Sequence, residues 1–194
     1  HLKLFGYHWD ECGHEAGQEM FCEMNDRFLV TARRFLKSDE GQVEDFYYQF
    51  REQKKGVAMV HSITGHNGFT LRDLVSYDVK HNEANGEKNL DGTEYNYSWN
   101  CGAEGPSRKK EVREKRSSQE RNAFLMLMLG MASPRILSGD EFGNTKKGNN
   151  NAYCQDNAIT WLDWSLLEKN KELFSYVKKL IEFRRNPVSY THLT

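Results

Sequence analysis

Short apolar runs alternate with amphipathic stretches along the chain. Residues 2–5, 57–63 and 136–137 are rich in the aliphatic and aromatic side chains that favour strands, and the first run ends at Gly6. We expect these three runs to be short buried strands.

Between the strands, apolar residues recur with the spacing of amphipathic helices. The expected helices cover residues 25–37, 43–50, a stretch from about 70, 111–131 and 173–181. Asn25 or Asp26 would cap the first helix, and Pro134 would end the fourth. The charged run 108–121 is expected to be a solvated helix face.

Two long segments, 78–110 and 144–157, carry almost no apolar periodicity. The first is rich in asparagine and glycine and also holds Tyr95, Tyr97 and Trp99. Connections in compact domains are usually about 4–6 residues long, so a segment of this length is either functional or disordered. Its aromatic residues favour an ordered, functional loop.

The order of strands and helices predicts a parallel sheet with crossover helices. The long polar loops follow strand ends, which is where (β/α)8 barrels carry their functional sites. A closed barrel of this kind needs about 250 residues, whereas the chain has 194. The sequence therefore predicts the α/β class with one core and an incomplete barrel.

Composition and charge narrow the range of partners. A net charge of −1 with 28% charged residues gives no reason to expect nucleic acid or an anionic membrane. No apolar run reaches the roughly 20 residues that a membrane helix needs. The four cysteines, Cys12, Cys22, Cys101 and Cys154, are scattered without a CxxC pair. This predicts free thiols in a cytoplasmic protein rather than a zinc site or a disulfide framework.

Four motifs follow one another along the chain. They are Asn25-Asp26-Arg27-Phe28, then His66-Asn67-Gly68-Phe69-Thr70-Leu71, then the polar segment 80–100, then Gly139-Asp140-Glu141-Phe142-Gly143 with the segment 148–157. In this order they resemble the glycogen debranching enzymes of the isoamylase type, within glycoside hydrolase family 13, from about residue 9 to 187. The second motif is similar to the His-Asp-Gly-Phe-Thr-Leu sequence of that family.

The resemblance implies the second half of a TIM-type (β/α)8 barrel, about strands five to eight with their helices. We therefore assign residues 1–187 to a partial glycoside hydrolase catalytic barrel and expect 188–194 to be a non-native tail. The resemblance also implies hydrolysis of α-1,6-glucosidic bonds without an organic cofactor. Calcium occurs in some relatives, but the sequence has no clear cluster of calcium ligands.

The resemblance further implies a retaining mechanism with three carboxylates. These are an Asp nucleophile after strand four, a Glu general acid after strand five and a stabilising Asp after strand seven. The nucleophile and the acid of a retaining glycosidase lie about 5–5.5 Å apart. Strand four would lie before residue 1, so the nucleophile is missing from this chain.

The two remaining catalytic positions are substituted. With Trp9 and Asp10 aligned, Tyr7 stands at the general-acid position, and Asn67 stands where the third carboxylate should follow His66. A phenol is a poor proton donor at neutral pH, and an amide carries no charge. We therefore expect the chain to be inactive. Glu11 or Glu15 could replace the acid only through a local insertion.

Polar and aromatic side chains near these positions are candidates for sugar contact, because amides bind hydroxyl groups and aromatic rings stack on sugars. The resemblance implies that His66 contacts the sugar at the cleavage point and that Asp140 and Glu141 are structural. The other candidates, all in the polar loops, are His81, Asn82, Glu83, Asn85, Trp99, Asn151, Tyr153, Gln155 and Asp156. As plainer alternatives, His66 could be a core histidine and the loop residues could be ordinary turn residues.

Three functions stay open at this point. The chain could be an inactive fragment of a debranching enzyme whose substrates are glycogen, limit dextrins and maltooligosaccharides. It could instead be a non-catalytic pseudoenzyme that binds α-glucan, or a truncated gene product without function. An incomplete barrel would also leave strand edges unpaired, which predicts self-association.

Overall fold

Parallel strands form one sheet in the computed structural model, which describes residues 4–6, 21–54 and 57–186. The strands that it describes pair in sequence order and are β1 (Leu4–Gly6), β2 (Phe21–Met24), β3 (Ala58–His61) and β4 (Ser133–Pro134). The register places Cys22 opposite Ala58 and Val60 opposite Ser133. Since every described pairing is parallel and the sheet is open, the α/β class and the unclosed sheet are confirmed. Self-association through the open edges stays a prediction.

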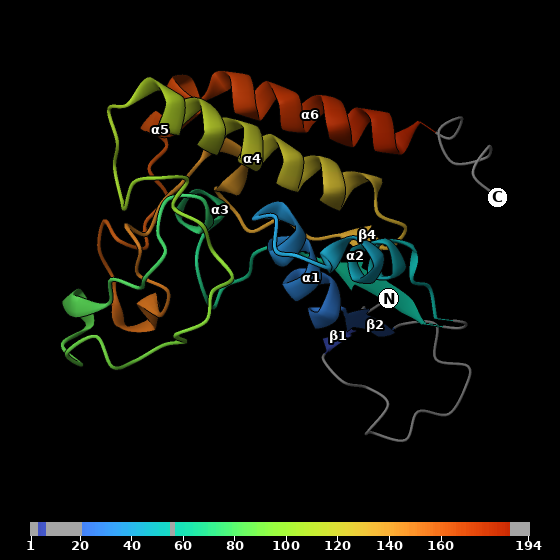
Figure 1. The fold of residues 1–194 in the computed structure, drawn as a ribbon, viewed down its shortest axis with the longest axis horizontal. Helices are drawn as coiled ribbons and strands as arrows, with labels where there is room; N and C mark the ends of the chain where they lie inside the picture. The colour runs from blue at the N-terminus through green and yellow to red at the C-terminus, as the bar shows by residue number, and fades with distance from the viewer. Residues whose placement is uncertain (1–3, 7–20, 55–56, 187–194) are drawn as a thin grey trace.

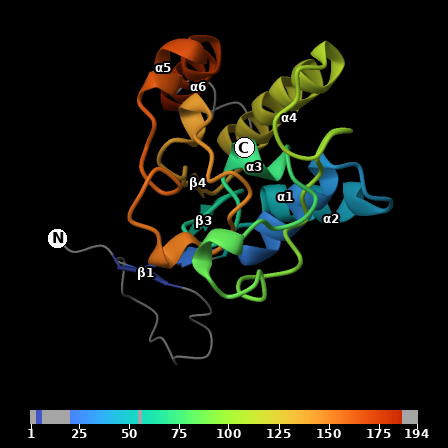
Figure 2. The same cartoon turned by 90° about the vertical axis from the view of Figure 1, so that its left-hand side faces the viewer.

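Helices connect β2 to β3 and β3 to β4, follow β4, and cover the sheet (Figure 1). The main helices are α1 (Asp26–Leu36) and α2 (Gln42–Arg51) before β3, α4 (Lys110–Leu129) before β4, and α5 (Ser165–Lys169) and α6 (Lys171–Arg185) after it. Single turns lie in the loops: α3 (Leu71–Leu74), η2 (Glu83–Asn85), η3 (Asp140–Phe142) and η4 (Ala152–Cys154). Figure 2 shows α4 and α6 as one layer, away from the polar loops. Among the described helices, none is both long and apolar enough to cross a membrane.

Asn25 ties the first helix to the sheet. Its Oδ1 accepts a hydrogen bond from the Phe28 N–H at 2.9 Å, so it is the N-cap that the sequence predicts. Its backbone N–H donates to the Val60 carbonyl at 2.9 Å, and its Nδ2 lies 3.3 Å from His61 Nε2. The His61 ring stacks on Phe28, with 3.8 Å between the ring centroids. Burial, with the Arg184 charge nearby, lowers the pKa of His61 to about 4, so the imidazole is neutral at neutral pH.

The hydrophobic core lies between the helices and the segment that follows β3. In α2, the aromatic rings of Phe46 and Phe50 pack against this core, whereas Val43 and Tyr47 are 70% and 58% exposed. The buried members of the core are Phe28, Ala32, Leu36, Ile63, Phe69, Leu71, Leu74, Tyr77, Ala123, Phe124, Leu127, Met128, Leu173, Val177 and Leu180.

One expected strand is wrong, and one strand was not predicted. The strand predicted at residues 136–137 is wrong, because the ladder with β3 already begins at Ser133 and its last hydrogen bond runs from the Arg135 N–H to the His61 carbonyl at 2.8 Å. Proline fits in β4 because a strand at the edge of the described sheet needs no ladder N–H there. The strand β2 was not predicted, since Cys22 and Glu23 interrupt its apolar pattern.

Three helices agree closely with the expectation, and two differ in detail. The helix expected near Thr70 is a single turn, which the Thr70 side chain caps by accepting from the Asp73 N–H. The charged run in α4 is not a wholly solvated face, because Arg116 and Glu120 are only 5% and 2% exposed. Glu120 forms an ion pair with Arg72 of α3 at 2.8 Å. Periodicity missed these two positions because segments distant in sequence cover them.

The cysteines agree with the expected free thiols as far as the structure describes them. Cys101 and Cys154 are free, and Cys12 lies outside the described residues. Burial raises the pKa of Cys101 to about 11, which makes this thiol unreactive at neutral pH.

Asp140 joins the segment after β4 to the segment after β3. The side chain is 2% exposed and accepts hydrogen bonds from the Leu71 N–H at 2.9 Å and from the Thr64 hydroxyl. Burial raises the pKa of Asp140 to about 7, against the opposing effect of these two hydrogen bonds. Asp140 therefore joins two loop segments and is not an exposed acid, which agrees with the structural role that the resemblance implies for it.

The Asn25→Ala variant should lower the free energy of unfolding by about 1–2 kcal/mol, because it removes a helix cap and leaves the Phe28 N–H without its acceptor. Urea denaturation followed by circular dichroism measures this loss. Asn122→Ala is the matched control, since that exposed amide donates to Gln119 within α4. Equal stability of the two variants would contradict the anchoring role of Asn25.

Asp140→Asn should change how stability depends on pH. The folded-state pKa near 7 lies above the unfolded value near 4, so the folded chain binds this proton more tightly. The contribution of Asp140 to stability is therefore complete below pH 4 and is lost as the pH rises to about 7. The variant should gain stability relative to the parent between pH 5 and about 8.

Asp163→Asn is the control, because hydrogen bonds from Ser165 lower the pKa of Asp163 and place its titration outside this range. A parallel pH profile for the parent chain and Asp140→Asn would refute the buried titration.

Candidate functional site

The segments that follow β3 and β4 meet beyond the carboxyl ends of these strands (Figure 1). The Gly68 N–H donates to the Asn150 carbonyl at 2.9 Å, and the His81 N–H donates to the Gly148 carbonyl at 2.7 Å. The first contact joins the motif that begins at His66 to the loop 144–157, and the second joins this loop to the loop 78–110. The structure therefore brings most of the predicted site residues into one surface.

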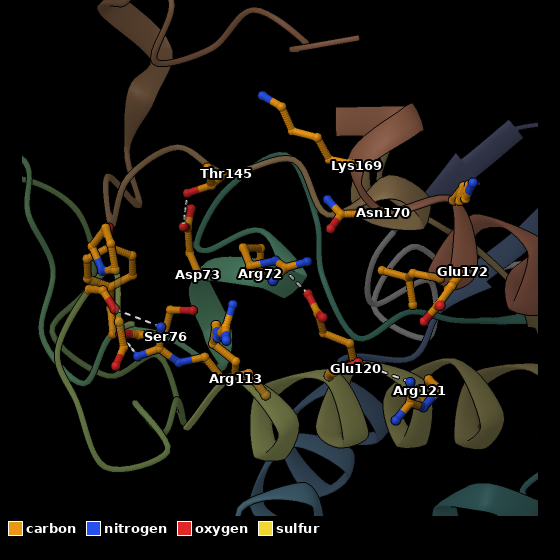
Figure 3. Close-up of a pocket in the computed structure, with 18 residues that line it drawn as sticks. Arg72, Asp73, Ser76, Arg113, Glu120, Arg121, Thr145, Lys169, Asn170 and Glu172 are labelled. Carbon is orange, nitrogen blue, oxygen red and sulfur yellow. Dashed lines mark hydrogen bonds and ion pairs between the residues drawn. The ribbon is translucent and has the colours of Figure 1, made fainter. Parts of the chain in front are cut away.

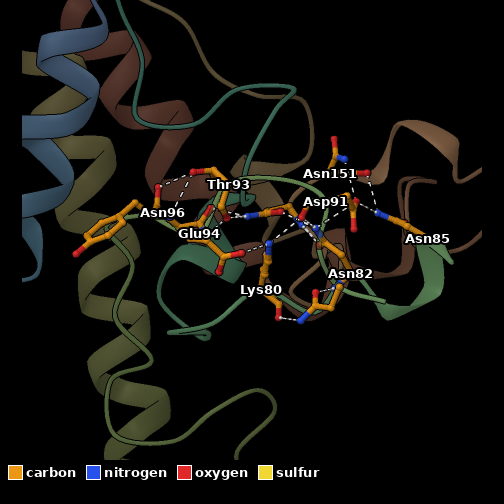
Figure 4. A network of polar contacts seen from close by, with 11 residues as sticks. Lys80, Asn82, Asn85, Asp91, Thr93, Glu94, Asn96 and Asn151 are labelled. Carbon is orange, nitrogen blue, oxygen red and sulfur yellow. Dashed lines mark hydrogen bonds and ion pairs between the residues drawn. The ribbon is translucent and has the colours of Figure 1, made fainter. Parts of the chain in front are cut away.

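Buried amides hold the two polar loops together (Figure 4). Asn82 and Asn150 are 0% and 3% exposed. The Asn82 Nδ2 donates to Asn150 Oδ1 at 2.9 Å, and the Asn150 backbone N–H donates to Asn82 Oδ1 at 2.9 Å. The Asn150 Nδ2 donates to the Thr93 carbonyl at 2.7 Å and to Asn96 Oδ1 at 3.0 Å. Since a buried amide without partners is costly, this reciprocal pairing fixes the loops relative to each other.

Asp91 lies at the centre of this amide network. Its Oδ2 accepts hydrogen bonds from Asn85 Nδ2 at 2.7 Å and Asn151 Nδ2 at 2.9 Å. The hydrogen bond from Asn85 is the main cause that lowers the pKa of Asp91, so the carboxylate is charged at neutral pH. The Lys80 Nζ donates to the Asp91 carbonyl at 2.9 Å and also pairs with Glu94. Asp91 thus orients two of the predicted substrate-binding residues.

Gly92 is required for this close approach of the loops. It adopts a φ of +74°, in the left-handed region that favours glycine. A Cβ atom at this position would lie 2.3 Å from Asn150 Oδ1 and 2.8 Å from Asn82 Nδ2. Any other residue would therefore push the amide pair apart.

His66 and Asn67 lie on the outer side of the surface. Both are exposed, and neither side chain is hydrogen-bonded to another residue that the structure describes. A contact with the loop 144–157 holds this segment in place, because the Lys146 Nζ donates a hydrogen bond to the His66 carbonyl at 3.3 Å. Lys146 itself donates its backbone N–H to the buried Asp73 carboxylate at 2.7 Å. The exposure of His66 excludes the alternative that it is a core histidine.

His81 and Glu83 lie at another edge of the same surface. The His81 Nε2 is 3.3 Å from Glu104 Oε1, and its Nδ1 is 3.9 Å from Glu83 Oε1. The His81 ring lies edge-on to the Tyr77 ring, with 5.3 Å between the ring centroids. The Glu83 side chain is 64% exposed. This pair could accept and donate hydrogen bonds to a ligand that rests on the loops.

The predicted residues from η4 onward have different surroundings. Tyr153 is 79% exposed, so its ring is accessible for stacking. The Gln155 Nε2 donates to Asn85 Oδ1 at 2.8 Å, which connects it to the amide network. Asp156 accepts a hydrogen bond from the indole N–H of Trp161 at 2.9 Å.

One predicted residue that the structure describes, Trp99, is not joined to this surface. Trp99 lies against the helices, where Lys115 Nζ of α4 is 5.1 Å from the centroid of its ring and its backbone N–H donates to the Leu74 carbonyl at 3.0 Å. Tyr7, the residue at the predicted acid position, lies outside the described residues.

Sequence analysis missed the residues that support the site from within. Asp91, Asn150 and Lys146 were not among the predicted site residues, although they hold Asn85, Asn82 and His66 in place. The only available signals were the Asp91-Gly92 pair and the run of three asparagines at 149–151, which are also common in ordinary turns.

The chemistry of this surface suits an uncharged, hydroxyl-rich ligand. Its exposed groups are amides, an imidazole, a carboxylate and a phenol, all of which exchange hydrogen bonds with hydroxyl groups. Within the part of the chain that the structure describes, no three histidine, cysteine, aspartate or glutamate residues are grouped so that they could hold a metal ion.

Curated relatives match almost the whole chain. It is 39% identical to the "Glycogen operon protein GlgX homolog" of Mycobacterium tuberculosis (strain H37Rv) over 197 residues, which is 95% of this chain and 27% of that protein. It is 42% identical to the "Glycogen debranching enzyme" of Klebsiella pneumoniae (strain MGH 78578) over 196 residues, which is 95% of this chain and 30% of that protein. The chain thus spans less than a third of the length of these relatives. No family model matches it.

Solved structures of similar fold are pullulanases. The pullulanase of Bacillus acidopullulyticus superposes with a TM-score of 0.61 and 18% identity, over 85% of this chain and 18% of that one. Type I pullulanase of Bacillus subtilis, in complex with maltose, gives a TM-score of 0.60 and 20% identity, over 86% of this chain and 22% of that one. At this level of identity the likeness supports the fold alone. Sequence and fold agree, and over nearly all of its length the chain is homologous to a segment of the glycogen debranching enzymes.

Proposed function

We propose that this chain is part of a debranching enzyme for α-1,6-linked glucans and that the chain by itself binds α-glucan without hydrolysing it. In this proposal β1 to β4 correspond to strands five to eight of the barrel. The observation that carries it is the exposure of His66 and Asn67 beside a rigid surface of amide groups.

The amide at Asn67 is the main argument against hydrolysis. An oxocarbenium-like transition state is stabilised by a nearby negative charge, and an asparagine supplies none. Asp140 does not replace it, because this side chain is buried and hydrogen-bonded to Thr64 and Leu71. With Tyr7 at the acid position, the chain also lacks a proton donor with a suitable pKa.

Binding remains chemically reasonable without those charges. Tyr153 offers an exposed ring, while His66, Asn67 and Glu83 offer exposed polar groups at the joined loops. The buried amides Asn82 and Asn150 keep the surface in one conformation, which lowers the entropic cost of binding. A non-catalytic α-glucan-binding protein is therefore the second candidate function, and it shares this binding surface.

The chain should release no reducing ends from glycogen or from limit dextrins. Each missing catalytic group costs roughly 10²–10⁴ in rate, and the substitutions at Tyr7 and Asn67 act together. A reducing-sugar assay with a pullulanase as positive control tests this expectation. Asn67→Asp restores one charge and should remain inactive. A rate above the protein-free blank for the parent chain would overturn the proposal of a silent chain, and activity of Asn67→Asp alone would show that the other catalytic groups are not missing.

Maltohexaose should bind weakly, with a dissociation constant of about 0.1–1 mM in titration calorimetry. His66→Ala and Tyr153→Ala should each weaken binding by about threefold or more, because each removes an exposed contact on the joined loops. Tyr48→Ala is the matched control, since Tyr48 is 64% exposed on the distant helix α2. No heat with the folded parent chain, or an equal loss in Tyr48→Ala, would refute binding at this surface.

A further inference from the structure

A second hollow lies apart from the amide surface, where α3, α4 and the start of α6 meet (Figure 3). It is a cavity of about 510 Å³, which falls within the range of small-molecule sites. Its walls come from segments distant in sequence, so no single motif marks it. Two of its lining residues also support the proposed glucan site, because Asp73 holds Lys146 and the Tyr77 ring contacts His81; none of its basic residues takes part there.

The lining of this cavity is strongly basic. Its three acidic side chains are Asp73, Glu120 and Glu172, and its six basic side chains are Arg72, Arg113, Arg116, Arg121, Lys169 and Lys171. Two of the acids are already engaged inside the protein. Glu120 pairs with Arg72 at 2.8 Å, and Asp73 accepts from the Thr145 hydroxyl and the Lys146 N–H. Since Glu120 and Arg72 pair with each other, the remaining lining cations still outnumber the remaining acids, and this excess of positive charge favours an anionic ligand.

Arg116 places one of these charges in a buried position. Its side chain is 5% exposed, and its guanidinium donates to the carbonyls of Gly105 at 2.7 Å and of Asn100 at 3.0 Å. Carbonyl dipoles satisfy the N–H groups but do not cancel the charge. Among the described residues no carboxylate forms an ion pair with Arg116, although the charges of Glu104 and Glu120 act on it at longer range. The buried cation therefore raises the electrostatic potential of the adjoining cavity.

More accessible cations lie at the rim. Arg113 and Lys171 are exposed, Arg121 is half-buried, and none of the three forms an ion pair with a carboxylate among the described residues. Arg113 and Arg121 come from α4, whereas Lys171 begins α6. Cations from two helices therefore line one cavity.

The start of α6 adds partial positive charge to the same cavity. This helix has 15 residues, and no side chain caps its first turn, because the Asn170 Nδ2 instead donates to the Phe142 carbonyl at 2.9 Å. Lys171, Glu172 and Leu173, whose N–H groups belong to this first turn, line the cavity. Free N–H groups at a helix start favour an anion, which here reinforces the arginine cluster.

We propose that this cavity binds the phosphate group of a small phosphomonoester. A phosphomonoester carries nearly two negative charges at neutral pH and offers three acceptor oxygens. Arginine forks match this geometry better than a point charge does. The volume leaves room for an attached group of about the size of a sugar or a nucleoside, with the Tyr77 ring as part of the wall.

Titration calorimetry with inorganic phosphate, a hexose phosphate and a nucleoside monophosphate tests the proposal. At least one of the two esters should bind more tightly than phosphate. The double variant Arg113→Gln with Lys171→Gln should weaken ester binding about tenfold or more, since it removes two charge-assisted contacts. Lys179→Gln is the matched control, because Lys179 is an exposed cation of α6 that does not line the cavity.

The outcomes separate cleanly. Tighter binding of an ester, lost in the double variant and kept in Lys179→Gln, supports the proposal, and the ester that binds identifies its source as a sugar or a nucleotide. No heat with either ester at about 5 mM, where a specific site should already be occupied, would overturn it. Binding of phosphate alone, or an equal loss in Lys179→Gln, would also overturn it. None of these results depends on whether the chain binds α-glucan.

Discussion

The reciprocal hydrogen bonds between Asn82 and Asn150 are the constraint on which the functional surface depends. The two loops that they join contain few apolar side chains, so hydrophobic burial alone cannot order them. Amide groups take this role because each has two donors and an acceptor, and a buried amide is stable only when its partners are in place. The carboxylate of Asp91 and the absence of a side chain at Gly92 complete the arrangement. In these two loops, a network of polar hydrogen bonds therefore provides the order that a hydrophobic core provides elsewhere in the protein.

This network separates residues that hold the surface from residues that can act on it. Asn82 is fully buried with its hydrogen bonds filled inside the protein, whereas His66, Asn67 and Tyr153 are exposed. Asparagines of similar appearance in the sequence therefore have different surroundings. The binding role predicted for Asn82 and the other loop residues stays a prediction. For the buried ones, the geometry favours an indirect contribution through the position of their neighbours.

Charge divides the molecule into two regions. The amide surface is polar and holds an uncharged residue, Asn67, where the resemblance implies a carboxylate. The cavity between α4 and α6 carries an excess of arginine and lysine, with Arg116 buried in its wall. The first region suits neutral hydroxyl groups and the second suits an anion. The glucan-binding role proposed for the first region does not involve the basic side chains of the second, for which we propose a separate anionic ligand.

The sequence alone determined the parallel α/β class, the helices that begin at Asp26 and Lys171, the cap at Asn25 and the resemblance to glycogen debranching enzymes. These follow from local periodicity, from short-range hydrogen bonds and from motif order, all of which can be read along one segment. Only the tertiary structure decided the position of β4, the existence of β2 and the burial of Arg116 and Glu120. It also decided the pairing of Asn82 with Asn150, 68 residues apart. A contact between distant segments leaves no periodic signal, because its partner is set by how the layers pack rather than by neighbours in the chain.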